Sequence, residues 1–120
     1  MAIEIMDAGS VIASATLVIP RAAGEPCRAV AARGISAVSS PNVNTMLVTL
    51  DQPVDPENTQ IHVSVNTIFG GTTPDRETTA TVYGPNQIAV GLAANSIGSS
   101  VFLLVLAIRG PTIEGTNTIP

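Results

Sequence analysis

The feature of this sequence that most constrains its fold is a two-residue alternation of apolar and polar side chains. In residues 61–69, Ile, Val and Phe alternate with His, Ser and Asn, and other short segments rich in Val, Ile and Thr behave in the same way. This period places the apolar residues on one face of a strand, as in an antiparallel sheet with one buried face. Gly, Pro, Asn and Asp separate the segments, as turn residues do. The pattern predicts an all-β chain.

The number and spacing of these segments predict the architecture. The chain has seven or eight predicted strands, with turn residues roughly every 8 to 12 positions. This number and spacing are typical of sandwiches and barrels. We therefore expect an antiparallel β-sandwich, jelly-roll or immunoglobulin-like. The chain has one Cys and no Trp, so the side chains that mark true immunoglobulin domains are missing. The predicted strands are residues 2–6, 10–19, 43–50, 61–69, 78–83, 87–93 and 101–108, with a tight hairpin at residues 84–86.

Two further segments need separate interpretation. For residues 27–38, Pro26 as first helical residue and Gly34 as C-terminal cap suit a short helix, whereas the alternation through Ile35 and Val38 suits a strand, which we favour. Residues 101–108 are apolar at almost every position, so we expect a central strand covered on both faces. Its most buried residues should include Val101, Leu103, Leu104, Val105 and Leu106.

The chain length fits a single domain with a terminal extension. A chain of 120 residues buries roughly two thirds of its unfolded surface around one core. We assign residues 1–109 to the β-sandwich and residues 110–120 to an extended C-terminal arm. The apolar residues Ile113 and Ile119 are isolated in the arm, and we expect them to be interface residues that dock into a neighbour's groove or add a strand at its edge.

Charge content is the strongest indication of function. Charged residues make up 12% of the chain, against about 25% in ordinary soluble domains, and the mean hydropathy is +0.40. Weakly charged surfaces tend to be buried in interfaces, so we expect a homo-oligomer. The net charge is −4, and the five positive residues are scattered arginines, which argues against nucleic-acid binding.

Candidate chemistry is sparse, and the sequence predicts neither an enzyme nor a bound cofactor. His62 is the only histidine and Cys27 the only cysteine; we expect an exposed imidazole and a structural thiol rather than a catalytic pair. The three aromatic residues lie in apolar strand-like contexts, which disfavours a stacking platform. Asp51, Asp55 and Glu57 could together hold Ca²⁺, but a rigid proline-flanked turn is the favoured interpretation.

Neither a targeting segment nor a membrane span is predicted. Glu4 and Asp7 lie near the start, where a secretory signal would carry positive charge, so we take Met1 as the true start with no signal peptide. The longest apolar run, residues 101–108, is far shorter than the roughly 20 residues of a membrane helix.

The Thr-, Ser- and Asn-rich strands, exemplified by QIHVSVNTIF and TTATVYGPNQIAV, contain no lysine, and a free tail follows them. In this the chain resembles small β-sandwich proteins of tailed-phage virions, the capsid decoration and head or tail accessory class. The resemblance implies a virion structural protein assembled in the host cytoplasm, which packs against copies of itself and a larger capsid or tail protein. By analogy with decoration proteins at local three-fold positions, we expect the copies to form a trimer. The alternative is a bacterial surface or secreted binding module directed at carbohydrate or protein.

Overall fold

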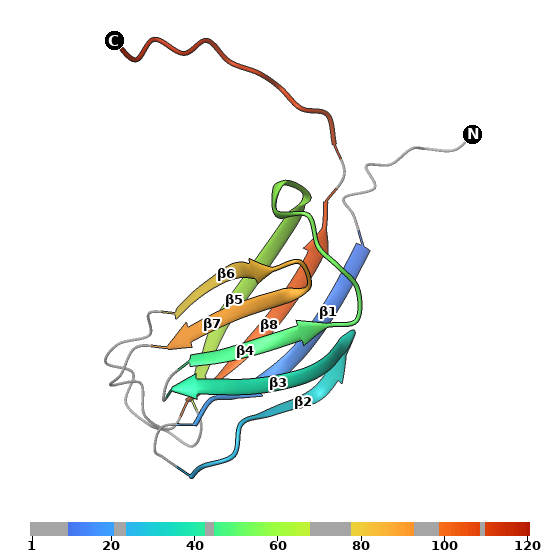
Figure 1. Ribbon diagram of the computed structural model, residues 1–120, viewed down its shortest axis with the longest axis vertical. Coiled ribbons are helices and arrows are strands. Elements are labelled where there is room, and N and C mark those ends of the chain that lie inside the picture. Colours follow the sequence, from blue (N-terminus) through green and yellow to red (C-terminus); the bar gives the residue numbers. More distant parts are fainter. Residues whose placement is uncertain (1–9, 21–23, 43–44, 68–77, 93–98, 109) are drawn as a thin grey trace, which may run out of the picture.

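The computed structural model describes residues 10–20, 24–42, 45–67, 78–92, 99–108 and 110–120. Within these ranges the chain forms eight strands in two antiparallel four-stranded sheets, which confirms the predicted β-sandwich (Figure 1). The strand predicted at residues 2–6 lies outside the described residues. Sheet A has the order β2 (Arg28–Arg33), β1 (Ser10–Val18), β8 (Ser99–Ala107), β5 (Thr59–Thr67), and sheet B the order β3 (Ile35–Asn42), β4 (Thr45–Leu50), β7 (Gln87–Leu92), β6 (Thr78–Gly84).

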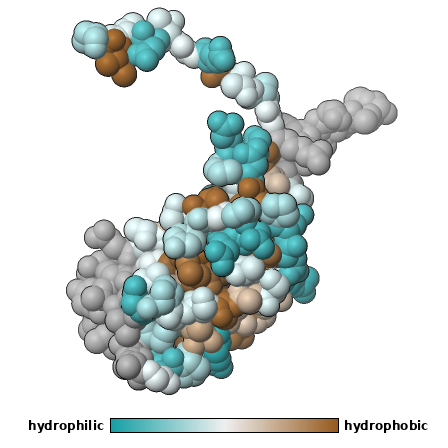
Figure 2. Space-filling model, in the orientation of Figure 1, coloured by the Kyte–Doolittle hydropathy of each residue, from teal (hydrophilic) through white to brown (hydrophobic). Residues whose placement is uncertain are grey.

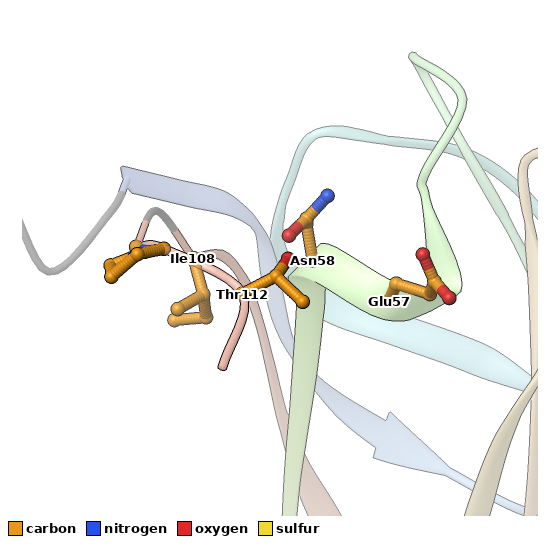
Figure 3. Close-up of a pocket in the computed structure, with 6 residues that line it drawn as sticks. Glu57, Asn58, Ile108 and Thr112 are labelled. Atoms are coloured by element: carbon orange, nitrogen blue, oxygen red, sulfur yellow. The ribbon is translucent and has the colours of Figure 1, made fainter. Parts of the chain in front are cut away.

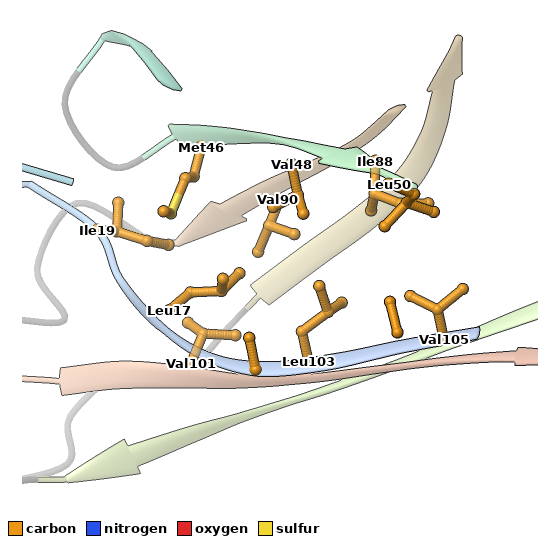
Figure 4. Packing of buried hydrophobic residues seen from close by; sticks show 12 residues of the cluster. Leu17, Ile19, Met46, Val48, Leu50, Ile88, Val90, Val101, Leu103 and Val105 are labelled. Carbon is orange, nitrogen blue, oxygen red and sulfur yellow. The ribbon is translucent and has the colours of Figure 1, made fainter. Parts of the chain in front are cut away.

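The hydrophobic core lies between the sheets and is built by their central strands (Figure 4). The two-residue period directs every second side chain of each central strand inward, where it is at most 3% exposed. Full burial of a Val, Leu, Ile or Met side chain contributes about 1.5 to 3 kcal/mol. The edge strands contribute only half-buried residues to this core. The buried apolar residues are Ala13, Ala15 and Leu17 of β1, Ile19 just after it, Met46, Val48 and Leu50 of β4, Ile88 and Val90 of β7, and Val101, Leu103 and Val105 of β8.

Strand β8 is central in its sheet, but the expectation that both of its faces are covered is wrong. Val101, Leu103 and Val105 are fully buried. On the other face Phe102 is 39% exposed, and Leu104 and Leu106 are half-buried. The physical reason is that a two-layer sandwich covers only the inner face of each sheet. A strand in such a sheet can therefore be apolar on both faces while only one of them is packed within the chain.

Residues 27–38 form strands, as we favoured, and not a helix. Strands β2 and β3 are consecutive and are separated only by Gly34, where the chain turns from sheet A into sheet B. Gly34 has a φ of +73°, and a Cβ atom there would collide with the carbonyl oxygen of Ile12. The Gly34 carbonyl accepts a hydrogen bond from the Asp51 amide at 2.9 Å. This corner therefore requires glycine, both for its backbone conformation and for its close approach to β1.

The hairpin predicted at residues 84–86 is confirmed, with Pro85 and Asn86 forming the turn between β6 and β7. The tip of this hairpin is hydrogen-bonded to the end of β4 and to the loop that follows it. The Leu50 amide donates to the Asn86 carbonyl at 2.7 Å, and the Val54 amide donates to the Pro85 carbonyl at 2.8 Å. These bonds satisfy polar backbone groups at the end of the core.

Residues 110–120 contain no helix or strand, and every one of them is exposed. Figure 1 shows this segment, the C-terminal arm, leaving the sandwich beyond the end of β8 and extending away from the body.

Candidate interaction surfaces

The side chains with the most reactive chemistry do not meet. His62 is exposed, as expected, on the outer face of β5, and its Nε2 lies 3.2 Å from Oε1 of Gln60. Cys27 is half-buried just before β2 and packs against the core. Strands β2 and β5 are the two opposite edges of sheet A. The imidazole and the thiol are therefore held apart by the full width of the sheet.

The carboxylates considered for calcium have a local structural role at Asp55. Its Oδ1 accepts a hydrogen bond from the Glu57 amide at 3.0 Å, and its Oδ2 accepts one from Nδ2 of Asn58 at 2.8 Å. Asp55 thereby caps the short 3₁₀ helix η1 (Pro56–Asn58), the use expected of an Asp before a proline turn. Asp51 and Glu57 are exposed. Among the described residues, no group of three or more His, Cys, Asp and Glu side chains is placed to hold a metal ion.

A hollow of about 470 Å³ lies where the arm leaves the body (Figure 3). Its lining comes from η1, the end of β8 and the start of the arm: Glu57, Asn58, Ile108, Gly110, Pro111 and Thr112. Among the described lining residues, the polar side chains are one carboxylate, one amide and one hydroxyl. An adjoining hollow of about 530 Å³ shares Asn58, Ile108 and Gly110 with it. Because the arm forms part of both walls, the shape of this region depends on the course of the arm.

The outer face of sheet A carries a band of apolar side chains, which we call the apolar stripe. It consists of Val11, Val30, Phe102, Leu104 and Leu106. Val11 pairs with Leu106 across the β1–β8 ladder, while Thr16 pairs with both Phe102 and Val30, and paired residues share a face. Val11 is 59% exposed and Val30 44%. The stripe therefore runs along β8 and includes Val11 at the start of β1 and Val30 of β2, on a surface that no described residue covers fully.

The aromatic residues differ from expectation. Tyr83 is 63% exposed at the end of β6, and Phe102 is exposed on the stripe, so neither is buried in its strand. Phe69 lies outside the described residues. Tyr83 and Phe102 belong to different sheets, which keeps the two rings from forming a common platform.

Charged residues are nearly absent from the strands. Of the eight strands in the described ranges, only β2 contains any, namely Arg28 and Arg33. The outer face of sheet B is formed instead by small or uncharged residues such as Ser39, Thr81 and Ala89. Figure 2 shows apolar residues reaching the surface of the body between neutral and hydrophilic ones. The flat faces of the sandwich therefore repel an approaching protein surface very little.

The arm presents the two most exposed large apolar side chains in the described part of the protein. Ile113 is 87% exposed and Ile119 is 81% exposed, and Figure 2 shows hydrophobic residues on the arm well away from the body. Both predicted interface residues are therefore almost fully exposed, and the described part of the chain hardly covers them.

No family model, curated protein or solved structure matches this chain. None of the described residues forms a helix long and apolar enough to cross a membrane. What the geometry defines is an antiparallel β-sandwich with nearly charge-free faces, an uncovered apolar stripe and a projecting arm. Sequence reasoning identified the arm but missed the stripe. Its indication was present in residues 101–108, because a sandwich can bury only one face of a strand that is apolar on both.

Proposed function

We propose that this chain is a structural subunit of a virion, a capsid decoration or accessory protein, which acts by packing against copies of itself and against a larger capsid or tail protein. The observation that carries the proposal is the distribution of charge: seven of the eight strands in the described ranges contain none. A lone soluble domain relies on surface charge to keep its apolar patches apart from those of other molecules. In an assembly those faces are covered, and the charge is not needed.

The apolar stripe supports the same proposal energetically. Removing apolar surface from water contributes about 25 cal/mol per Å². Val11, Val30 and Phe102 retain 59%, 44% and 39% of their surface exposed. Burying them against another subunit therefore yields a favourable free energy that folding alone has not used. The flat, uncharged faces suit tight side-by-side packing, in which charged residues are depleted from the centre of the interface.

The resemblance to β-sandwich proteins of tailed-phage virions supports the choice of assembly. It rests on the lysine-free strands rich in Thr, Ser and Asn and on the free tail. A projecting arm gives such a subunit a second means of attachment, since the arm can reach beyond the contact between two globular bodies.

The test is recovery of the chain from density-purified particles, with its copy number measured by quantitative mass spectrometry. We expect stoichiometric incorporation. Phe102→Asp places a charge on the stripe and should remove the chain from particles. Gln52→Asp is the matched control, because it places the same charge at an exposed loop position outside the strands, and it should leave incorporation unchanged.

The proposal is wrong if the folded chain is absent from particles, or if both variants are incorporated like the parent chain. A monomer attached to a cell surface that binds glycan or protein would instead establish the alternative, a binding module.

A further inference from the structure

The two long sides of the sandwich differ in how their strand edges are protected. On the side formed by β2 and β3, the pairing register shifts both between β1 and β2 and between β3 and β4. Strand β2 carries two arginines, and β3 contains Pro41. Bulges, charged residues and proline are the features by which proteins prevent an edge strand from pairing with another chain. This side is closed to strand addition.

The edge strand β5, on the other side, has none of these features. It pairs with β8 over nine consecutive residues without a register shift. It contains no proline and no Asp, Glu, Lys or Arg. The other edge strand on this side, β6, is shorter and has a register shift between Val82 and Gly84. Strand β5 is therefore the most regular free edge in the described part of the fold.

The hydrogen-bond pattern identifies which backbone groups of β5 are free. The Ile108 amide donates to the Asn58 carbonyl at 2.7 Å, and Thr59 pairs with Ala107. In an antiparallel ladder this makes Thr59 and Ala107 a pair without mutual hydrogen bonds, and the pattern then alternates. The even-numbered residues of β5 bond to β8, whereas Ile61 and Val63 direct their N–H and C=O groups away from it. Within the residues that the structure describes, these groups have no backbone partner.

The side chains of the same two residues are also incompletely packed. Ile61 and Val63 face the core but remain half-buried. An added strand alongside β5 would pair their free backbone groups and cover their exposed sides. The edge thus lacks both the hydrogen bonds and the apolar contacts that one more strand supplies.

The arm has the properties of such a strand. Residues 112–119, the sequence TIEGTNTI, lie between Pro111 and Pro120 and include three Thr and two Ile, residue types favoured in strands. Ile113 and Ile119 are six positions apart, so both point to the same face of an extended chain. The eight-residue length matches the nine residues of β5, and Glu114 is the only charged residue in it. Figure 1 shows the arm directed away from its own body, which places it within reach of another molecule.

We propose that the free edge of β5 accepts residues 112–119 of a second copy of this chain as an additional strand. Main-chain hydrogen bonds form to Ile61 and Val63, and Ile113 and Ile119 extend the core beside them, the mode of recognition known as strand addition. The inference rests on the proposed function, since it names the surface through which the copies join. It makes the assembly heterologous, with the arm of one copy on the edge of the next, and such contacts close into a ring when the rotation between copies closes and otherwise extend as a filament.

Residue-resolved amide hydrogen exchange of the full chain, measured over a series of concentrations, tests this proposal. The amides of His62 and Ser64 are protected by β8 at every concentration. The amides of Ile61 and Val63 should exchange about tenfold more slowly at about a hundred times the dissociation constant than in dilute solution, because most arms are then bound and few edges remain free. The double variant Ile113→Asp, Ile119→Asp should abolish this concentration-dependent protection. Thr116→Asp, on the opposite face of the arm, is the matched control and should preserve it.

The outcomes separate this inference from the proposed function. An oligomer in which the Ile61 and Val63 amides exchange freely overturns the edge assignment and leaves the structural role intact. Protection that is independent of concentration also overturns it, because another part of the same chain then covers the edge. A chain that remains monomeric at all concentrations contradicts both proposals.

Discussion

The two long sides of the sandwich show how one small protein treats equivalent edges differently. On the β2–β3 side the chain itself turns the corner at Gly34, and two arginines, a proline and register shifts protect what remains. On the β5 side a regular nine-residue ladder ends in backbone groups that have no backbone partner among the described residues. Strand edges left open are hazards for a monomer. In the proposed assembly, the β5 side is the one that pairs with a second copy of the chain.

The two faces of β8 show the same contrast within one strand. Leu103 is fully buried between the sheets, whereas its neighbour Leu104 is half-buried on the apolar stripe. Both positions are leucine, but the architecture packs only the first of them against the other sheet. The packed core and the Gly34 corner account for the stability of the fold, whereas the apolar stripe and the β5 edge account for the proposed assembly.

The largest effect on stability is expected at Gly34, where the chain passes from sheet A to sheet B. Gly34→Ala combines a left-handed backbone conformation with a collision against the Ile12 carbonyl, and should lower the free energy of unfolding by about 2 to 5 kcal/mol. Gly115→Ala, in the arm, has no neighbouring atoms within 4 Å and serves as control. Chemical denaturation measures both, and equal stability of the two variants would show that the corner is not as tight as described.

The two leucines of β8 should separate stability from assembly. Leu103→Ala creates a cavity in the core and should cost about 2 to 5 kcal/mol in the free energy of unfolding. Leu104→Ala, on the stripe, should cost less than about 2 kcal/mol but should weaken self-association. Denaturation and sedimentation measure the two effects. Equal losses of stability would mean that the outer face of β8 is packed as closely as the inner one.

Proline substitutions test which backbone groups of β5 are free. His62→Pro removes an amide bonded to β8 and leaves the Leu104 carbonyl unpaired, which should cost about 1 to 3 kcal/mol. Val63→Pro removes an amide that points outward, so the fold should lose less while strand addition is blocked. Val63→Ala shortens the same side chain but keeps the amide, and should preserve assembly better than Val63→Pro. If Val63→Pro unfolds the chain and His62→Pro does not, the assigned hydrogen-bond alternation is reversed.

The smallest effect on stability is expected at Ala31, where the pairing between β1 and β2 is irregular. Ala31 has a φ of 54°, a conformation that costs a non-glycine residue about 1 to 2 kcal/mol, whereas glycine adds about 0.4 to 1 kcal/mol of unfolded-state entropy. Ala31→Gly should therefore raise the unfolding free energy by roughly 0.5 kcal/mol. Ala32→Gly, next to it in β2 at negative φ, should lower stability instead. A loss for both variants would argue against backbone strain at Ala31.

The sequence predicted the central features of the fold because they depend on local patterns. Alternation in residues 43–50 and 87–93 located β4 and β7, since their inner faces are buried and their outer faces are not. Gly34 correctly indicated a residue with positive φ. A glycine at a helix C-terminus and a glycine at a corner between two sheets adopt the same conformation, however, and only the packing of Gly34 against β1 distinguishes the two cases. The strand order and the open edge of β5 could not be predicted, because both depend on which strands pair across the whole chain. The apolar stripe was missed because residues 101–108 show no alternation, so the sequence does not indicate which of their side chains face outward.

Sedimentation velocity of the full chain at micromolar concentration tests the central claim most directly. We predict a defined oligomer, with a trimer of about three times the 12.2 kDa chain mass as the expected species. Removal of residues 111–120 should weaken assembly and leave the fold intact, because all ten of these residues are exposed and the buried core residues among those described lie between Ala13 and Val105. Identical behaviour with and without these residues would contradict the role of the arm, and a monodisperse 12.2 kDa monomer for the full chain would contradict the account as a whole.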